Sequence, residues 1–276
     1  MRIDNILIAT ASAQGVDIAL ERARVIEHIT EADVYLLQVI WDFIEEEPDS
    51  VISKEAQQRI IERLMKSEQR VLEDAAAPYV DKIETLTTEV AWAKHMEERV
   101  ANEVVSRQVD LVIKPVIEAS RRVHDWFVTP VDWRLMRALD APILFAQAPT
   151  WRKDRCVLAA LDIAPAHAGV SNRIIDCAKS LAEVLACPVH FVHVTPNADS
   201  KTHAVLERMV EGDAELHVKE GKPAEVIDKL ADDLDASLTI VGTAARRTIG
   251  KLLVGNTAEE IIGRTTRDLV TVHAPS

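Results

Sequence analysis

The sequence predicts an α/β protein made of two copies of one domain, each with a parallel sheet flanked by helices. Three observations lead to this fold class. Short apolar runs of strand length alternate with amphipathic helical segments, which is the pattern of βαβ units with right-handed crossovers. The same series of runs occurs twice along the chain. The length of 276 residues suits two domains of ordinary size.

The first copy starts with an apolar strand at residues 5–11 and an amphipathic helix at residues 16–29. A second strand follows at residues 34–39, and later strands at residues 110–113 and 141–145. Between the second and third strands lies a longer stretch with apolar residues at helical spacing, namely Ile60, Ile61, Leu64, Val71, Leu72 and Ala75. This spacing predicts a long helix packed on the sheet.

The second copy repeats the order with strands at residues 155–162, 189–194, 237–241 and 268–272. The helix after its first strand carries apolar Ile174, Ala178, Leu181 and Val184. The copies meet at the proline-bearing junction 147–150, so we expect domains at residues 1–148 and 153–276. This repeat favours two separate copies of the fold over one continuous sheet.

Composition limits the function classes. The net charge of −13 argues against a general nucleic-acid or anionic-membrane surface, because phosphates would be repelled at long range. Three cysteines without CxxC spacing fit reduced thiols better than a disulfide framework. No signal-peptide pattern and no apolar run of about twenty residues occurs, so the expectation is a cytoplasmic protein.

A candidate phosphate site follows the strand at residues 237–241. Gly242 permits a turn of either backbone sign, and Arg246 supplies a local positive charge. Asn256 offers a helix N-cap, with Glu259 three residues later as its capping-box partner. The start of such a helix presents unpaired N–H groups and a positive dipole end, which suit a phosphate.

The chain resembles the universal stress protein family in its tandem-domain form. The family's nucleotide-binding members carry Gly-x-x-Gly, nine residues, then Gly followed by Ser or Thr; here the string runs from Gly242 and Ala245 to Gly255, Asn256 and Thr257. Residues 220–227 look like the family's third strand-to-helix junction, and residues 127–133 look like the E-type tandem subgroup. The resemblance covers essentially the whole chain.

The resemblance implies flavodoxin-like or Rossmann-like (adenine nucleotide alpha hydrolase-like) domains and a stress-response role without general catalytic machinery. It further implies an ATP or adenine-nucleotide site in the second half, with Mg²⁺ left open. Asp162 would bind the adenosine portion and the backbone at Val194 would meet the base. Gly242, Arg246, Gly255, Asn256 and Thr257 would surround the phosphates. Ala245 and Asn256 depart from the family pattern, and the Cβ of Ala245 could block a close approach.

In the first half the same comparison predicts no nucleotide. Ala11 stands where the aspartate is expected, Pro115 where Gly242 stands, and Thr129-Pro130 where Gly255-Asn256 stand. Proline has no N–H to donate to a phosphate. Four residues instead make this region apolar and favour a core or interface over a lipid site, namely Trp126, Phe127, Trp133 and Met136.

No metal site is predicted. His190 and His193 are three residues apart on a strand, so they face opposite sides and cannot bind one ion together. We expect His190 to be partly exposed and His193 to be packed. No other His, Cys or carboxylate spacing matches a zinc site.

The leading interpretation is a non-enzymatic binding or adaptor protein with a nucleotide and an unidentified protein as partners. The alternatives are a slow ATPase, for which no metal carboxylate or general base can be named, and a module for an apolar or nucleotide-sugar ligand. In this family the last strands of two domains pair across a two-fold axis. Residues 143–145 and 269–272 could pair within one chain as an internal pseudo-dimer, which leaves a further homodimer open.

Overall fold

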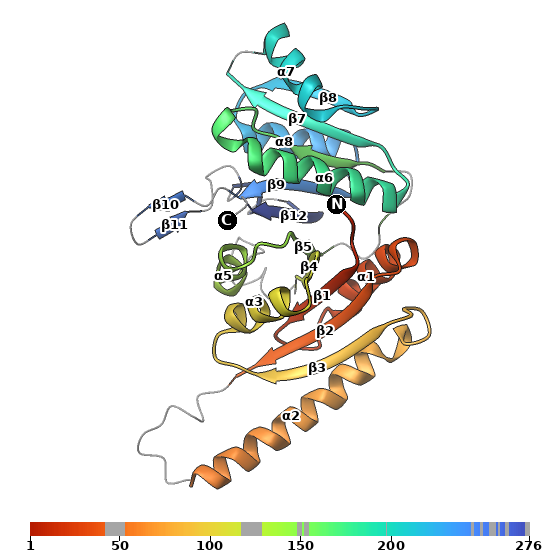
Figure 1. Ribbon diagram of the computed structural model, residues 1–276, viewed down its shortest axis with the longest axis vertical. Helices are drawn as coiled ribbons and strands as arrows, with labels where there is room; N and C mark the ends of the chain where they lie inside the picture. The colour runs from red at the N-terminus through yellow and green to blue at the C-terminus, as the bar shows by residue number, and fades with distance from the viewer. Residues whose placement is uncertain are drawn as a thin grey trace.

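The computed structural model describes residues 1–41, 53–116, 129–147, 151, 155–196, 198–243, 246–248, 251–253, 258, 260–262 and 265–273. Strands and helices alternate along these residues, and the sheet is mostly parallel (Figure 1). The predicted α/β fold class is confirmed. Among the described residues, no helix is both long enough and apolar enough to cross a bilayer.

The first half contains five strands. Its elements are β1 (Asn5–Thr10), α1 (Val16–Thr30), β2 (Asp33–Ile40), α2 (Lys54–Ala76), β3 (Leu86–Trp92), α3 (Met96–Ser106), β4 (Leu111–Pro115), α5 (Pro130–Ala138) and β5 (Ile143–Ala146). The predicted long helix is α2, and its buried residues are Ile61, Leu72 and Ala76. Val71, expected on the packed face, is 47% exposed.

The second half repeats this order. Its elements are β6 (Val157–Ala160), α6 (Ala168–Leu185), β7 (Val189–Thr195), α7 (Ser200–Val210), β8 (Glu215–Glu220), α8 (Pro223–Asp233), β9 (Leu238–Thr243), β10 (Arg246–Thr248), β11 (Lys251–Leu253) and β12 (Asp268–His273). Pro223 opens α8 at a position where no intrahelical N–H bond is lost. The predicted junction between the third strand and its helix is therefore where β8 leads into α8.

The strands form one ten-stranded sheet in the order β3-β2-β1-β4-β5-β12-β9-β6-β7-β8. Each half has the same internal order, with its first strand between its second and fourth. The two halves join where β5 and β12 pair antiparallel, with Val270 opposite Leu144. The expected pairing of the two last strands is thus confirmed. The expectation that the halves would not form one continuous sheet is wrong, because this pairing connects them.

Helices cover both faces of the sheet. Alternate strand residues point to opposite faces, and Ile6 and Ile8 pack in one core with residues of α1, α2, α6 and α7. Leu7 and Ala9 pack in a second core with residues of α3, α5 and α8. Both cores contain residues from the two halves, so each core is shared across the β5–β12 junction.

A buried ion pair also crosses this junction. The Arg22 guanidinium of α1 donates from Nε to Asp268 Oδ2 at 2.5 Å, and both side chains are fully buried. The other oxygen of Asp268 accepts the backbone N–H of Gln147 at 2.8 Å. The Trp151 ring lies 4.7 Å from the Arg22 guanidinium carbon. These contacts fix the start of β12 against the first half.

Candidate functional site

The strand order of the second half reverses between β6 and β9. From β6 the chain moves outward to β7 and β8, then returns to the other side of β6 as β9. Ligands of open parallel sheets bind beyond the carboxyl ends of strands at such a reversal. Asp162 lies two residues after the end of β6, and Gly242 lies near the end of β9. Both predicted residues therefore lie at the carboxyl ends of the two strands that flank this reversal.

Local hydrogen bonds hold Asp162 in place. Its Oδ1 accepts the backbone N–H of Ala164 at 2.9 Å, and its Oδ2 lies 2.5 Å from His167 Nδ1. The Asp162 side chain is 52% exposed. Partial burial raises the pKa of this carboxyl, but the bonds from Ala164 and His167 outweigh burial and hold the pKa below its ordinary value. Asp162 is therefore an ionised acceptor that faces solvent.

The loop that carries Asp162 is also anchored through its backbone. Ser171 of α6 donates its hydroxyl to the Asp162 carbonyl at 2.7 Å, and His193 Nδ1 lies 2.9 Å from the Leu161 carbonyl. Val194, the next residue of β7, is half-buried at the carboxyl end of that strand. The structure thus places Val194 on the strand next to β6, at the same edge of the sheet as Asp162.

Gly242 has a packing role that differs from the predicted turn. It lies inside β9, and its φ is not among the positive values. A Cβ atom at this position would lie 2.6 Å from Val170 Cγ1 and 3.1 Å from Ile174 Cδ1 of α6. Glycine is required here by the close approach of α6 to the sheet, so its presence is not by itself a sign of a phosphate loop.

The remaining predicted residues lie after β9. The backbone of Arg246 is in β10, which pairs antiparallel with β11 in a two-stranded hairpin. Figure 1 shows this hairpin projecting to one side of the sheet. Arg246 is therefore part of a short strand, of which the sequence pattern carries no sign. Gly255, Asn256 and Thr257 lie outside the described residues, as do Ala245 and Glu259.

The corresponding helix start in the first half is already capped by its own side chains. Thr129 Oγ1 accepts the Asp132 N–H at 3.3 Å, and Asp132 Oδ2 accepts the Thr129 N–H at 2.7 Å, which is a complete capping box. The other Asp132 oxygen lies 3.5 Å from Lys114 Nζ. The Asp132 carboxylate therefore occupies the start of this helix, and the sequence predicts no nucleotide phosphate there.

Among the apolar residues predicted near this helix, Met136 is buried and Trp133 is half-buried against the core. These two pack as core residues. Trp126 and Phe127 lie outside the described residues.

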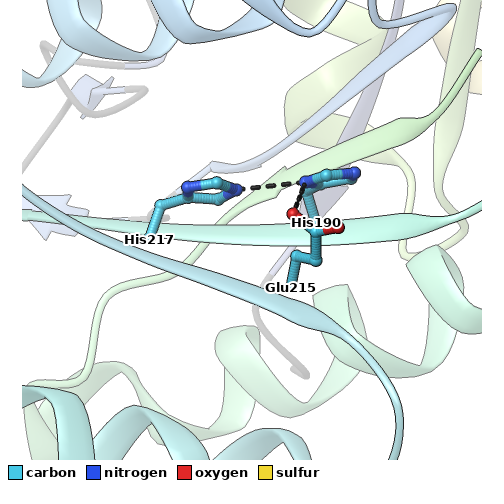
Figure 2. Close-up of side chains that lie close together, drawn as sticks. All are labelled: His190, Glu215 and His217. Carbon is cyan, nitrogen blue, oxygen red and sulfur yellow. Dashed lines mark hydrogen bonds and ion pairs between the residues drawn. The ribbon is translucent and has the colours of Figure 1, made fainter.

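The histidines of β7 differ from their predicted exposure. His190 is buried and His193 is half-buried, although the two do face opposite sides of the sheet, as expected. His190 Nδ1 lies 3.0 Å from His217 Nε2 of β8 and 3.5 Å from Glu215 Oε2 (Figure 2). Burial and the neighbouring His190 lower the pKa of His217. Sequence spacing missed this cluster because the pairing of β7 with β8 creates it.

Comparisons with known proteins agree with the fold. The model of the universal stress protein family matches residues 200–273. A universal stress protein E homolog of Haemophilus influenzae is 25% identical over 306 residues, covering 98% of this chain and 97% of the relative. Universal stress protein E of Escherichia coli K12 is 24% identical over 296 residues, covering 97% and 93%.

Solved structures are similar along the same length. The crystal structure of a putative universal stress protein from Pseudomonas aeruginosa is 24% identical with a TM-score of 0.71, covering 99% of this chain and 94% of that one. A universal stress protein from Archaeoglobus fulgidus is 14% identical with a TM-score of 0.70, covering 99% of each. Both likenesses concern the fold.

Proposed function

The chain belongs to the universal stress protein family, and from this premise we propose that it is a non-enzymatic stress-response binding or adaptor protein with one adenine-nucleotide site. The proposed site lies in the second half, beyond the carboxyl ends of β6 and β9. ATP is the proposed ligand. The repeated units are residues 1–148 and 153–276, and only the second retains the site.

One observation carries this proposal. Asp162 is an ionised, half-exposed carboxylate at the carboxyl end of β6, beside the point where the strand order reverses. A carboxylate at this position accepts hydrogen bonds from hydroxyl groups, as the acidic residue of dinucleotide-binding folds does with ribose. The backbone of Val194 lies at the same edge and supplies main-chain polar groups for a base.

The two halves differ at this position. In the first half the residue equivalent to Asp162 is Ala11, and Pro115 at the end of β4 has no N–H group. The helix start nearby is capped by Asp132. A phosphate there would have to displace a buried carboxylate from its hydrogen bonds, so the stoichiometry is expected to be one nucleotide per chain.

No residue is assigned a catalytic role. The groups that contact Asp162, namely His167, Ala164 and Ser171, hold the loop after β6 in its observed conformation. A slow ATPase would need a metal-binding carboxylate and a positioned base beside the phosphates. Steady release of phosphate from ATP would support this alternative.

The test is equilibrium binding of labelled ATP, with and without Mg²⁺, to the full chain and to Asp162→Asn. Asp162→Asn keeps the shape of the side chain and removes its charge, so we expect affinity to fall by roughly tenfold, the effect of about 1.4 kcal/mol from a charge-assisted hydrogen bond. Asp176→Asn is the matched control, because Asp176 is an exposed carboxylate on α6, two turns beyond the start of that helix.

Equal ATP affinity in Asp162→Asn and the unaltered chain would place the nucleotide elsewhere, and no ATP binding at all would favour a different ligand. Turnover of ATP followed over hours separates the two remaining functions. An adaptor leaves ATP intact, whereas steady phosphate release abolished in Asp162→Asn would identify an enzyme.

A further inference from the structure

The cluster of His190, Glu215 and His217 lies at the opposite end of the strands from the proposed nucleotide site. It sits at the amino ends of β7 and β8, whereas Asp162 follows the carboxyl end of β6. Glu215 is directly opposite His190 in the parallel register, and His217 is two residues later on the same face. The backbone pairing of two strands therefore brings all three side chains together.

We propose that His190, Glu215 and His217 form a binding site for Zn²⁺ at this edge of the sheet. The three ligand atoms lie within 4.8 Å of one another. Zn–N and Zn–O bonds of roughly 2.0–2.2 Å at tetrahedral angles place ligand atoms roughly 3.3–3.5 Å apart. The observed separations, 3.0 Å from His190 to His217 and 3.5 Å from His190 to Glu215, are close to those ligand-to-ligand distances.

The donor set selects the kind of ion. Two imidazoles and one carboxylate suit zinc and other late divalent transition metals, whereas Mg²⁺ and Ca²⁺ require oxygen ligands. Three protein ligands leave a fourth position for water or a partner group, as in open zinc sites. Solvent can reach the cluster from the side of Glu215, because the Glu215 side chain is 71% exposed while that of His190 is 8% exposed.

The two rings must tilt for a metal to enter, because their facing nitrogens now point at each other across the hydrogen bond. The two rings are nearly parallel, with an interplanar angle of 12° and centroids 5.3 Å apart. In the metal-free state one imidazole donates a proton to the other across the 3.0 Å gap. When that ring holds its proton on the far nitrogen instead, both facing nitrogens become acceptors, so neutral imidazoles can bind the ion without losing a proton.

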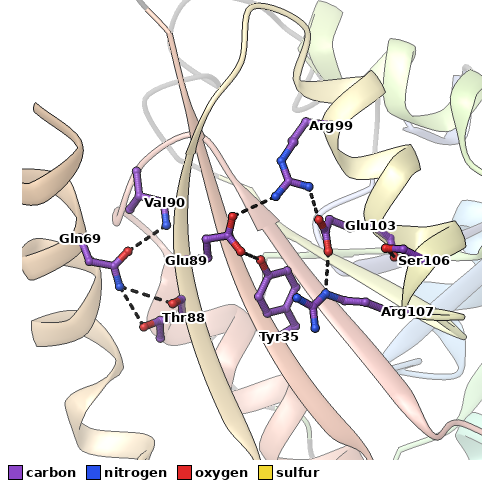
Figure 3. Close-up of polar contacts among 9 residues, drawn as sticks. All are labelled: Tyr35, Gln69, Thr88, Glu89, Val90, Arg99, Glu103, Ser106 and Arg107. Carbon is purple, nitrogen blue, oxygen red and sulfur yellow. Dashed lines mark hydrogen bonds and ion pairs between the residues drawn. The ribbon is translucent and has the colours of Figure 1, made fainter. Parts of the chain in front are cut away.

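The first half has different residues at the positions equivalent to His190 and His217. Leu7 of β1 pairs with Tyr35, as Leu158 of β6 pairs with His190, so Tyr35 and His190 are equivalent in the repeat. Tyr35 donates its hydroxyl to Glu89, the equivalent of His217. Figure 3 shows this pair extended by arginines of the neighbouring helix.

Those arginines make the first-half cluster a closed ion-pair network. Arg99 Nη2 lies 2.9 Å from Glu89 Oε1, and the Arg107 guanidinium lies 3.6 Å from the centre of the Tyr35 ring. Cationic side chains thus occupy the space beside Tyr35 and Glu89. In the second half the residue added beside the pair is instead the anionic Glu215. The first half therefore has a network that contains its own cations at this place, whereas the second half has a set of donors that can bind a cation.

The experiment uses the full chain after chelator treatment and dialysis. Zn²⁺ is titrated in competition with a chromophoric chelator, and Co²⁺ is added to a second sample to record its visible absorption. We expect one Zn²⁺ per chain and a Co²⁺ spectrum of low coordination number. His217→Gln and Glu215→Gln are expected to weaken Zn²⁺ binding by at least about tenfold, because even the loss of an outer-shell partner costs that much.

The matched control is His203→Gln. His203 is 45% exposed on α7 and lies 3.3 Å from Glu207, so it represents an ordinary surface His–Glu pair of the same half. Its removal is expected to leave the Zn²⁺ affinity unchanged. An equal loss in His203→Gln, or unaltered binding in both cluster variants, would overturn the proposal and indicate scattered surface binding.

Thermal unfolding supplies a second measurement. Zn²⁺ is expected to raise the melting temperature of the unaltered chain, because a ligand that binds only the folded state stabilises it. In excess chelator the variants and the unaltered chain should have the same melting temperature. If His217→Gln does not fold, Glu215→Gln decides the question, since Glu215 is an exposed residue on an edge strand.

Discussion

Gly242 is the residue at which a packing requirement and a ligand motif coincide. Gly242→Ala would bring a Cβ to 2.6 Å from the stiff, β-branched Val170, so the chain should lose about 1–3 kcal/mol of stability. The measurement is urea unfolding. Val170→Ala removes the clashing methyl group. Gly242→Ala should therefore cost less stability when it is added to Val170→Ala than when it is made in the unaltered chain. No recovery would show that the glycine is needed for a reason other than α6.

Single residues differ in how far the sequence could predict them. The position of Asp162 was predictable, because an apolar run marks where β6 ends and the next residues fall at the sheet edge. Its ligand-binding role came from the family resemblance and stays a prediction. His190 was placed on the correct strand with the wrong exposure. Its partners, Glu215 and His217, lie on another strand, and their contact depends on a register that no spacing along one strand encodes.

At the scale of elements, α3 is held to the sheet by paired charges. Glu103 accepts from Arg107 Nε at 2.6 Å and pairs with Arg99, which also reaches Glu89 of β3. Burial raises the pKa of Glu103, but the hydrogen bonds from Arg99 and Arg107 dominate and lower it. A lowered folded-state pKa means that the stabilisation is present above the unfolded pKa and is lost as the pH falls through the folded one.

Glu103→Gln should therefore destabilise the chain near neutral pH by roughly 0.5–2 kcal/mol, the range for two partly screened pairs. The difference from the unaltered chain should shrink as the pH falls below about 4.5, the ordinary value for this carboxyl. Urea midpoints recorded between about pH 7 and pH 3 would follow it. A difference that stays constant over that range would assign the effect to packing instead of charge.

Most elements were predictable from periodicity, and the exceptions have physical causes. Helix α2 was found from its apolar spacing, yet Val71 is exposed because only a narrow stripe of this long helix touches the sheet. The β10–β11 hairpin was missed, since three-residue strands carry too little alternation to be recognised. Gln69 illustrates a contact without a sequence signal: its Oε1 accepts the Val90 N–H of β3 at 2.9 Å.

At the scale of the whole molecule, the two halves share a sheet, two cores and a buried ion pair. The β5–β12 pairing was predictable from the family resemblance, and it covers two strands that would otherwise be exposed edges. The continuity of the sheet and the Arg22–Asp268 pair were not, because they depend on how the halves are oriented. The two uncovered edge strands thus favour an internal pseudo-dimer. Contacts between residues distant in sequence fix how its halves are oriented.

This organisation predicts that the chain survives a cut between its proposed domains. A protease site inserted between Pro149 and Thr150 should yield two fragments that still elute together, since Leu144 and Val270 are fully buried at the junction. Asp268→Ala in the cut chain removes the carboxylate that pairs with the buried Arg22 guanidinium, and should weaken association by about 3–5 kcal/mol. Asp235→Ala is the control, because its ion pair with Arg155 at 3.1 Å lies within one half and is partly exposed. Fragments that separate in buffer alone would mean that the linker, and not the shared sheet, holds the halves together.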